Sequence, residues 1–331
     1  MVHEYHPATT GNEALELIRR YRSHMADVPS IEPLAHEFPY LTHELGLQGV
    51  TLFDLSANRA GTFKWRGALA GADHLRRQGT PGLIAPSAGN HARGAILAGE
   101  LFGLPTTVIV PTTAPELKQQ GLRGLWDSTL LRVYARGRHF DDTLPYVDSF
   151  SGDLLHPYDD PSVIAGQGTI VDDLLQLKPS VEHIVLPVGG AGLTAGVVSR
   201  LTELGKGTVK VHAMQAAGSD SLSRSLATGH VVEATAPNKR YGGSAVTHVG
   251  TYALDLCRRA ENLTVYTVPD QAVFGVAELY EQSRQDLLRQ NTPNFEPTTL
   301  VAVAGLGQLA AEYTNVVVLG TGQNAPISDI V

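Results

Sequence analysis

The chain of 331 residues has room for two domains, or for one large α/β domain, around a substantial buried core. Its 43% hydrophobic and 18% charged residues are typical of a globular protein, and its net charge of -8 argues against a nucleic-acid partner. The single cysteine, Cys257, excludes an intrachain disulfide and a cysteine-based zinc site. No apolar run is long enough to cross a bilayer and the first residues show no secretory signal, so we expect a cytoplasmic protein without a membrane partner.

Short apolar strands alternate with helices along most of the chain. Residues 12–25 carry apolar side chains at helical spacing, and residues 49–53 are predicted to form a strand. Further strands are expected at 82–85, 106–110, 130–133, 184–187, 209–214, 263–268 and 315–319, and helices at 92–102, 116–125, 139–150, 168–177, 194–204 and 270–289. This alternation predicts an α/β fold with parallel sheets and right-handed crossovers.

Lys64 lies just after a glycine turn at Gly61, where a helix is predicted to begin. Thr62 is expected to cap the N-terminus of that helix. A lone lysine at such a junction is more often a solvated surface residue. Three more glycine-rich turns follow along the chain, each at the expected end of a strand, and they favour a functional interpretation.

A loop of small residues, Gly189-Gly190-Ala191-Gly192-Leu193, joins a predicted strand to a predicted helix. Such a loop leaves backbone N–H groups free at the positive end of the helix dipole, which suits a phosphate. The glycine spacings of dinucleotide-binding and P-loop motifs are both absent. Many turns are glycine-rich only because they pack tightly, so this loop alone indicates little.

A second turn, Ser87-Ala88-Gly89-Asn90-His91, follows the strand predicted at 82–85. Its N–H groups are able to hold a carboxylate while the Asn90 amide reaches another group. The alternative is that Asn90 or His91 only caps its own helix. The pattern leaves both interpretations open.

Lys64, the glycine loop and Thr321 together match one cofactor. An amine for an aldehyde, a cradle for a phosphate and a hydroxyl for a ring nitrogen describe pyridoxal 5'-phosphate. Six segments occur in order from about residue 50 onward: GTFKWRGA, PSAGNHARG, HPYDDPSVIAGQGTI, LPVGGAGLTAG, FEPTT and LGTGQN. On these segments the chain resembles the fold-type II pyridoxal-phosphate enzymes, and most of all the threonine/serine dehydratase and serine racemase group.

The resemblance implies a fold like that of the tryptophan synthase β subunit, with two open, twisted and mainly parallel sheets flanked by helices. Residues 1–79 and 151–331 would form a large domain that binds the cofactor, and residues 80–150 a small domain. The active site would lie in the cleft between them. An amino-acid substrate and a homodimer are implied as well.

The resemblance also implies a role for each matched residue. Lys64 forms a Schiff base with the cofactor and, once freed by the amino acid, removes its α-proton. Phe63 packs against the ring, Asn90 bonds the phenolic oxygen, and Thr321 faces the ring nitrogen. The phosphate is held by Gly189, Gly190, Ala191, Gly192 and Leu193, and the substrate carboxylate by Ser87, Ala88, Gly89, Asn90 and His91.

The implied reaction is α,β-elimination. A neutral hydroxyl at Thr321 makes the ring a weaker electron sink than an aspartate would, which favours loss of a β-leaving group over transamination. Threonine, serine or a similar β-hydroxy amino acid would then be dehydrated and deaminated to a 2-oxo acid and ammonia. Two alternatives stay open: a β-replacement synthase that captures the same aminoacrylate intermediate, and a non-catalytic relative that binds pyridoxal phosphate.

Several positions depart from the family pattern. Ala88 replaces the acid of the racemases and of the diaminopropionate ammonia-lyases, so neither activity is expected. Ala191 replaces a third glycine, a mild change if its φ is negative. Gln215 and Ser221 replace carboxylates that bind a metal, so no metal is predicted. Glu296 is expected to lie behind the residues that contact the ligands.

Overall fold

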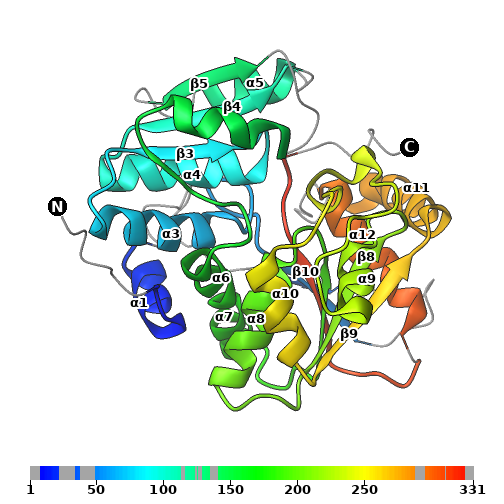
Figure 1. Cartoon of the computed structure of the whole chain (residues 1–331). Helices are drawn as coiled ribbons and strands as arrows, with labels where there is room; N and C mark the ends of the chain where they lie inside the picture. The colour runs from blue at the N-terminus through cyan, green and yellow to red at the C-terminus, as the bar shows by residue number, and fades with distance from the viewer. Residues whose placement is uncertain are drawn as a thin grey trace.

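The computed structural model describes residues 8–21, 34–37, 49–112, 116–123, 125, 129–134, 141–287, 295–309 and 311–324. Within these ranges the chain forms two sheets flanked by helices, one above the other in Figure 1. None of the described helices combines the length and the hydrophobicity that a membrane span requires.

The larger sheet has six strands in the order β1-β2-β10-β7-β8-β9. They are β1 (Leu34–Glu37), β2 (Val50–Asp54), β7 (His183–Pro187), β8 (Lys210–Ala216), β9 (Leu263–Val268) and β10 (Val316–Gly320). Only β1 runs antiparallel to its neighbour, and the other pairs are parallel. The first and last strands of the parallel part, β2 and β10, lie side by side although they are far apart in the sequence.

The smaller sheet has four parallel strands in the order β5-β4-β3-β6. They are β3 (Leu83–Pro86), β4 (Thr106–Pro111), β5 (Thr129–Tyr134) and β6 (Asp153–Leu154). The predicted α/β fold with two mainly parallel sheets is therefore confirmed. Strand β6 comes after residue 150, so the small sheet includes a segment beyond the range predicted for a small domain.

Helices flank the two sheets. They are α1 (Gly11–Tyr21), α3 (Trp65–Arg77), α4 (Asn90–Phe102), α5 (Glu116–Arg123), α6 (Pro161–Gly168), α7 (Ile170–Leu177), α8 (Gly192–Glu203), α9 (Ser221–Thr228), α10 (Thr251–Arg259), α11 (Asp270–Leu287) and α12 (Pro297–Gly305). Ile184 and Leu186 share a core with α7, α8 and α10, whereas Val185 points to the opposite core with α11 and α12. Alternation along β7 thus serves two cores, as in a sheet buried on both faces.

Helix α3, which follows Lys64, packs with the smaller sheet. Leu69 and Ala72 share a core with Leu83 of β3 and Ala95 of α4, and Ile18 of α1 joins them. Figure 1 shows α3 directly below α4 and above α1. Lys64 therefore lies at the boundary between the two sheets.

The segment predicted as an α-helix at 139–150 is instead the 3₁₀ helix η2 over Asp141–Ser149. Pro145 inside it has no N–H to donate and its ring crowds the preceding turn, which disfavours a regular α-helix there. His139 falls outside the described residues. The structure adds two further 3₁₀ segments, η3 (Lys239–Ser244) and η5 (Leu306–Gln308).

Candidate functional site

A cavity of about 480 Å³ lies where the carboxyl ends of strands from both sheets come together. This is where parallel sheets usually bind ligands. Every residue predicted for the site lines it: Phe63, Lys64, Ser87, Ala88, Gly89, Asn90, His91, Gly189, Gly190, Ala191, Gly192, Leu193 and Thr321. Four predicted turns that are distant in sequence therefore share one space.

Lys64 is the residue immediately before α3, and its side chain projects into this cavity. Its Nζ donates a hydrogen bond of 2.8 Å to the carbonyl oxygen of Pro157 and lies 5.3 Å from the centre of the Phe63 ring. Desolvation lowers the pKa of Lys64 to about 8, although the negative charge of Glu296 raises it. A lysine of this kind is able to act as a nucleophile and as a base near neutral pH.

Thr62 was predicted to cap helix α3, but the N-cap position is Lys64 and the helix begins at Trp65. The Thr62 hydroxyl still accepts a hydrogen bond from the backbone N–H of Lys64 at 3.3 Å, immediately before the helix. Thr62 also forms an isolated β-bridge with Gly322, and its hydroxyl donates to the carbonyl oxygen of Thr321 at 3.2 Å. This pairing ties the lysine turn to the loop after β10.

The glycine loop after β7 is a row of unpaired donors. None of the six consecutive backbone N–H groups from Gly189 to Thr194 has a hydrogen-bond acceptor among the described residues. They lie at the N-terminus of α8, which has no side-chain cap. Buried N–H groups rarely stay unpaired, so this row is suited to a strong anionic acceptor such as a phosphate.

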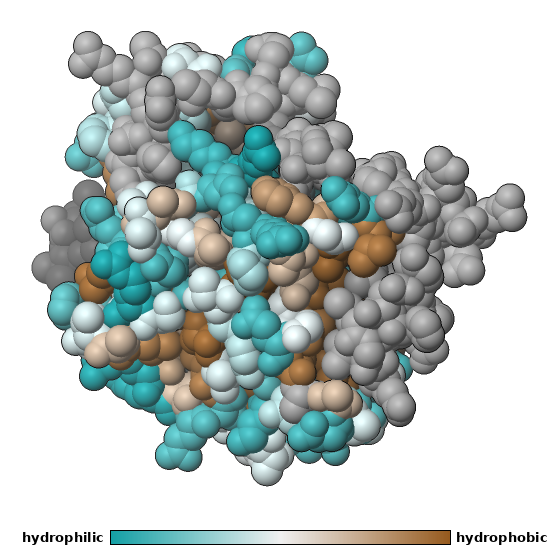
Figure 2. Space-filling model, turned by 90° about the vertical axis from the view of Figure 1, so that its right-hand side faces the viewer, coloured by the Kyte–Doolittle hydropathy of each residue, from teal (hydrophilic) through white to brown (hydrophobic). Residues whose placement is uncertain are grey.

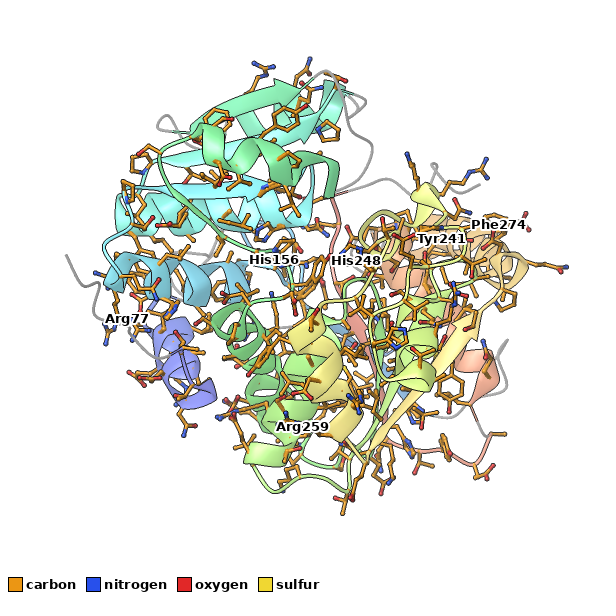
Figure 3. The ribbon with its side chains drawn as sticks, viewed as in Figure 1. Arg77, His156, Tyr241, His248, Arg259 and Phe274 are labelled. Carbon is orange, nitrogen blue, oxygen red and sulfur yellow. The ribbon has the colours of Figure 1, made fainter. Side chains whose placement is uncertain are left out.

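The glycines of this loop are required by close packing. A Cβ at Gly190 would overlap the ring of Tyr158, and one at Gly189 would overlap the carbonyl oxygen of Gly243. The Tyr158 hydroxyl donates to the carbonyl oxygen of His248 at 3.4 Å, and Figure 3 shows His248 beside His156 near the middle of the molecule. The loop is thus walled by chain segments on two sides.

Ala191 corrects one expectation. Its φ is 67°, in the left-handed region, so replacing glycine by alanine is not a mild change here. A left-handed conformation at a non-glycine residue costs roughly 1–2 kcal/mol. The surrounding loop maintains this strain at the start of α8.

The turn after β3 is more open than the glycine loop. Ser87, Ala88, Gly89 and Asn90 are all half-buried. The N–H groups of Ala88, Asn90 and His91 have no acceptor among the described residues, whereas that of Gly89 donates to the Ser87 hydroxyl. Three free donors at the N-terminus of α4 are suited to a carboxylate.

His91 is neutral in this turn. Burial, and next the positive charge of Lys64, lower the pKa of His91 to about 3. Its Nε2 lies 2.7 Å from the carbonyl oxygen of Leu155, so in the neutral ring Nε2 carries the proton and donates it. The side chain therefore anchors the turn to the segment after β6.

Glu296 is the residue that the sequence interpretation underestimated. Its carboxylate is 4% exposed and accepts from the Asn90 amide at 2.8 Å through each oxygen. The Thr321 hydroxyl lies 3.4 Å from one of these oxygens and 3.2 Å from the Thr299 hydroxyl. Glu296 thus lines the cavity itself and links groups from both sheets. The segment FEPTT contained the signal.

Other residues that line the cavity belong to the segments matched in the sequence analysis but were not predicted as site residues. Pro157 and Tyr158 belong to the segment HPYDDPSVIAGQGTI, and Thr194 to LPVGGAGLTAG. The cavity is also lined by Lys239, Gly242, Gly243, Ala245, Val246 and Thr247, to which no motif pointed. A loop defined only by its tertiary position leaves no local pattern to read.

At the positions considered for a metal, Gln215 donates from Nε2 to the hydroxyls of Ser223 at 2.6 Å and Thr267 at 3.0 Å. The described part of the chain holds no group of three or more His, Cys, Asp or Glu side chains arranged for a metal ion.

Comparison with known proteins agrees with this geometry. The family described as "Pyridoxal-phosphate dependent enzyme" matches residues 32–322. A catabolic L-threonine dehydratase of Staphylococcus aureus is 29% identical over 323 residues, covering 91% of this chain and 88% of the relative.

Two solved structures have the same fold. Threonine deaminase isoform 2 of Solanum lycopersicum superposes with a TM-score of 0.78 at 26% identity, covering 98% of this chain and 94% of that one. Maize serine racemase superposes with a TM-score of 0.81 at 21% identity, covering 97% and 95%.

Proposed function

The chain belongs to the family of pyridoxal-phosphate dependent enzymes, and from this premise we propose that it is an ammonia-lyase acting on a β-hydroxy amino acid such as threonine or serine. The products would be a 2-oxo acid and ammonia. One observation carries the proposal: the Lys64 amine, the unpaired N–H row at 189–194 and the turn at 87–91 line the same cavity.

The cofactor is pyridoxal 5'-phosphate, and the cavity residues fit it. Lys64 offers an amine for its aldehyde, the loop at 189–193 offers unpaired N–H groups for its phosphate, and Thr321 offers a hydroxyl for its ring nitrogen. Phe63 and Asn90 would contact the ring and its phenolic oxygen. When bound, the cofactor supplies an electron-withdrawing ring that stabilises negative charge at the substrate Cα.

Lys64 is proposed as the base that removes the α-proton. With a pKa of about 8, a fraction of its amines is uncharged near neutral pH and able to accept a proton at Nζ. The Pro157 carbonyl holds this nitrogen within the cavity. The N–H groups of the turn at 87–91 would orient the substrate by its carboxylate.

Two neutral positions favour elimination. Thr321 places a hydroxyl, not a carboxylate, in the loop after β10. Ala88 has no group that could return a proton to the opposite face of Cα, as racemisation requires. Loss of the β-hydroxyl is then the outcome that the side chains support.

We further propose a large domain of residues 1–79 and 151–331, a small domain of residues 80–150, a homodimer and a cytoplasmic location. The domain division follows the two sheets except at its borders, where β6 and α3 fall in the range of the large domain although β6 pairs with β3 and α3 shares a core with it. The dimer rests on the family resemblance. On the face shown in Figure 2, hydrophobic residues are interspersed with hydrophilic ones.

The test compares the wild type with Lys64→Ala. The purified wild type should be yellow with bound cofactor and should release 2-oxo acid and ammonia from at least one β-hydroxy amino acid in a panel. Lys64→Ala should lose the colour and at least about 10²-fold in rate, because one group serves as anchor and base. Lys206→Ala, at an exposed lysine outside the cavity lining, is the control. A wild type that binds no pyridoxal phosphate would contradict the proposal.

A further inference from the structure

Thr194 has a buried hydroxyl without a partner at the edge of the glycine loop. The residue is 0% exposed, lines the cavity and is the third residue of α8. Its Oγ1 has no hydrogen-bond partner among the described residues. A buried hydroxyl left unpaired costs roughly 1–3 kcal/mol, so such groups usually have a bonding partner.

The usual partner of a helical threonine is a backbone carbonyl one turn earlier. Thr202, on the same helix, does this: its hydroxyl donates to the carbonyl oxygen of Val198 at 2.9 Å. The carbonyls one turn before Thr194 accept from elsewhere, Gly190 from the Gly250 N–H and Ala191 from the Ala195 N–H. Unlike the Thr202 hydroxyl, the Thr194 hydroxyl therefore has no backbone acceptor in the described part of the chain and is available to another acceptor.

The acceptor that the surroundings favour is an anion. The N–H of Thr194 is the last of the six unpaired donors, so its hydroxyl and this row lie at one end of one helix. A hydroxyl also donates to a charged oxygen more strongly than to a neutral one. Lys239 lines the same cavity and adds positive charge.

We propose that the Thr194 hydroxyl donates a hydrogen bond to a phosphate oxygen of the cofactor. This inference rests on the proposed function, because it needs pyridoxal phosphate as the ligand. It adds a side-chain donor to a site otherwise built from backbone N–H groups. Thr194 is then a cofactor-binding residue that contacts the phosphate of the cofactor and not its pyridine ring.

The experiment measures two dissociation constants on the full chain after its cofactor has been removed, one for pyridoxal 5'-phosphate and one for pyridoxal, which lacks the phosphate. Thr194→Val keeps the shape of the side chain and removes the hydroxyl. This substitution should weaken the binding of pyridoxal 5'-phosphate about ten- to a hundredfold and leave the dissociation constant of pyridoxal within about twofold of the wild-type value. Thr194→Ser keeps the hydroxyl and should stay within about threefold of the wild type for both.

Inorganic phosphate provides a second readout that does not depend on the aldehyde. It should raise the melting temperature of the cofactor-free wild type and of Thr194→Ser more than that of Thr194→Val. Thr202→Val, whose hydroxyl is bonded within the helix, and Ser244→Ala, whose buried unpaired hydroxyl belongs to a residue outside the cavity lining, are the controls. Both should bind pyridoxal 5'-phosphate like the wild type.

Equal weakening of pyridoxal 5'-phosphate and pyridoxal in Thr194→Val would assign Thr194 to packing and overturn the inference. Unchanged affinity in Thr194→Val would overturn it as well and leave the proposed function intact. A wild type without affinity for pyridoxal 5'-phosphate would overturn both. If Thr194→Val does not fold, Thr194→Ala is measured against the same two ligands with the same expected results.

Discussion

Two junctions between a strand and a helix face the cavity, one after β3 and one after β7. Both follow a parallel strand, and both helices begin without a side-chain cap, at Gly89 for α4 and at Ala191 for α8. Each leaves backbone N–H groups unpaired. By local construction the two junctions offer the same kind of donor row to an anion.

Their surroundings differ. At the loop after β7, a Cβ on Gly190 would overlap Tyr158, whereas a Cβ on Gly89 would meet no atom within 4 Å. The loop is largely buried and the turn is half-exposed at residues 87–90. A walled site suits a group that stays through the reaction, and an open one suits a group that exchanges at each turnover.

Adding one methyl group to each junction should give the largest difference in function between the two. Gly190→Ala forces Tyr158 to move out of its place and should lower the affinity for pyridoxal 5'-phosphate more than about 100-fold, or prevent folding. Gly89→Ala should bind the cofactor within about threefold of the wild type and change mainly the KM of the amino acid. Cofactor titration and steady-state kinetics check this pair. Equal loss of cofactor in both variants would show that the two junctions do not differ in function.

Acid should destabilise the open turn through His91. Burial holds the pKa of His91 at about 3, below the ordinary value of 6.5, so only the unfolded chain takes up its proton between these values. The contribution of neutral His91 to the free energy of unfolding is fully present above about pH 6.5. It is lost as the pH falls toward 3, by about 1.4 kcal/mol per pH unit. Urea unfolding at pH 6, 5 and 4 should show a shallower loss of stability in His91→Gln than in the wild type, by about this slope.

The matched control substitution for that series is His230→Gln, at an exposed histidine. A slope for His91→Gln equal to that of the wild type would mean that His91 does not stay neutral in the folded chain.

Glu296 accepts hydrogen bonds from Asn90 of the open turn, and its negative charge acts on Lys64. Removing that charge should therefore shift the pH dependence of the reaction. The negative charge of Glu296 raises the pKa of Lys64, and Glu296→Gln should therefore lower it. The ascending limb of kcat against pH should move to lower pH, by up to about one unit. The measurement is a kcat–pH profile from pH 6 to 10. A limb that moves to higher pH would contradict the assigned electrostatics.

The smallest effect concerns the walled loop. Ala191→Gly should relieve the left-handed strain and raise the free energy of unfolding by about 1 kcal/mol, measured in urea on the cofactor-free protein. Asn315, the other non-glycine residue with positive φ among the described ones, is the comparison. Asn315→Gly should gain less, because asparagine tolerates this region better than alanine. A destabilised Ala191→Gly would argue that chain flexibility outweighs the strain at this position.

The sequence by itself determined the elements that depend on short stretches of chain. The strands β2, β3, β4, β7, β8 and β10 and the turns that follow them are encoded within about ten residues each, by apolar runs bounded by glycine or proline. Within the larger sheet, parallel pairing then places the carboxyl ends of β2, β7 and β10 at one edge. Strand β3 belongs to the smaller sheet, so the turn after it reaches the same cavity only through the packing of the two sheets. Helix α12 escaped prediction because all of its residues are buried and its apolar side chains show no helical period.

Only the tertiary structure decided the pairings across long distances in the chain. Asn90 and Glu296 are separated by 206 residues and Lys64 and Pro157 by 93, so no local pattern encodes these hydrogen bonds. The φ of Ala191 and the unpaired hydroxyl of Thr194 likewise follow from how Tyr158, Gly243 and Gly250 pack around α8. Local preference chooses a turn, but the packing of distant segments decides which of its donors stay free and how open it is to solvent.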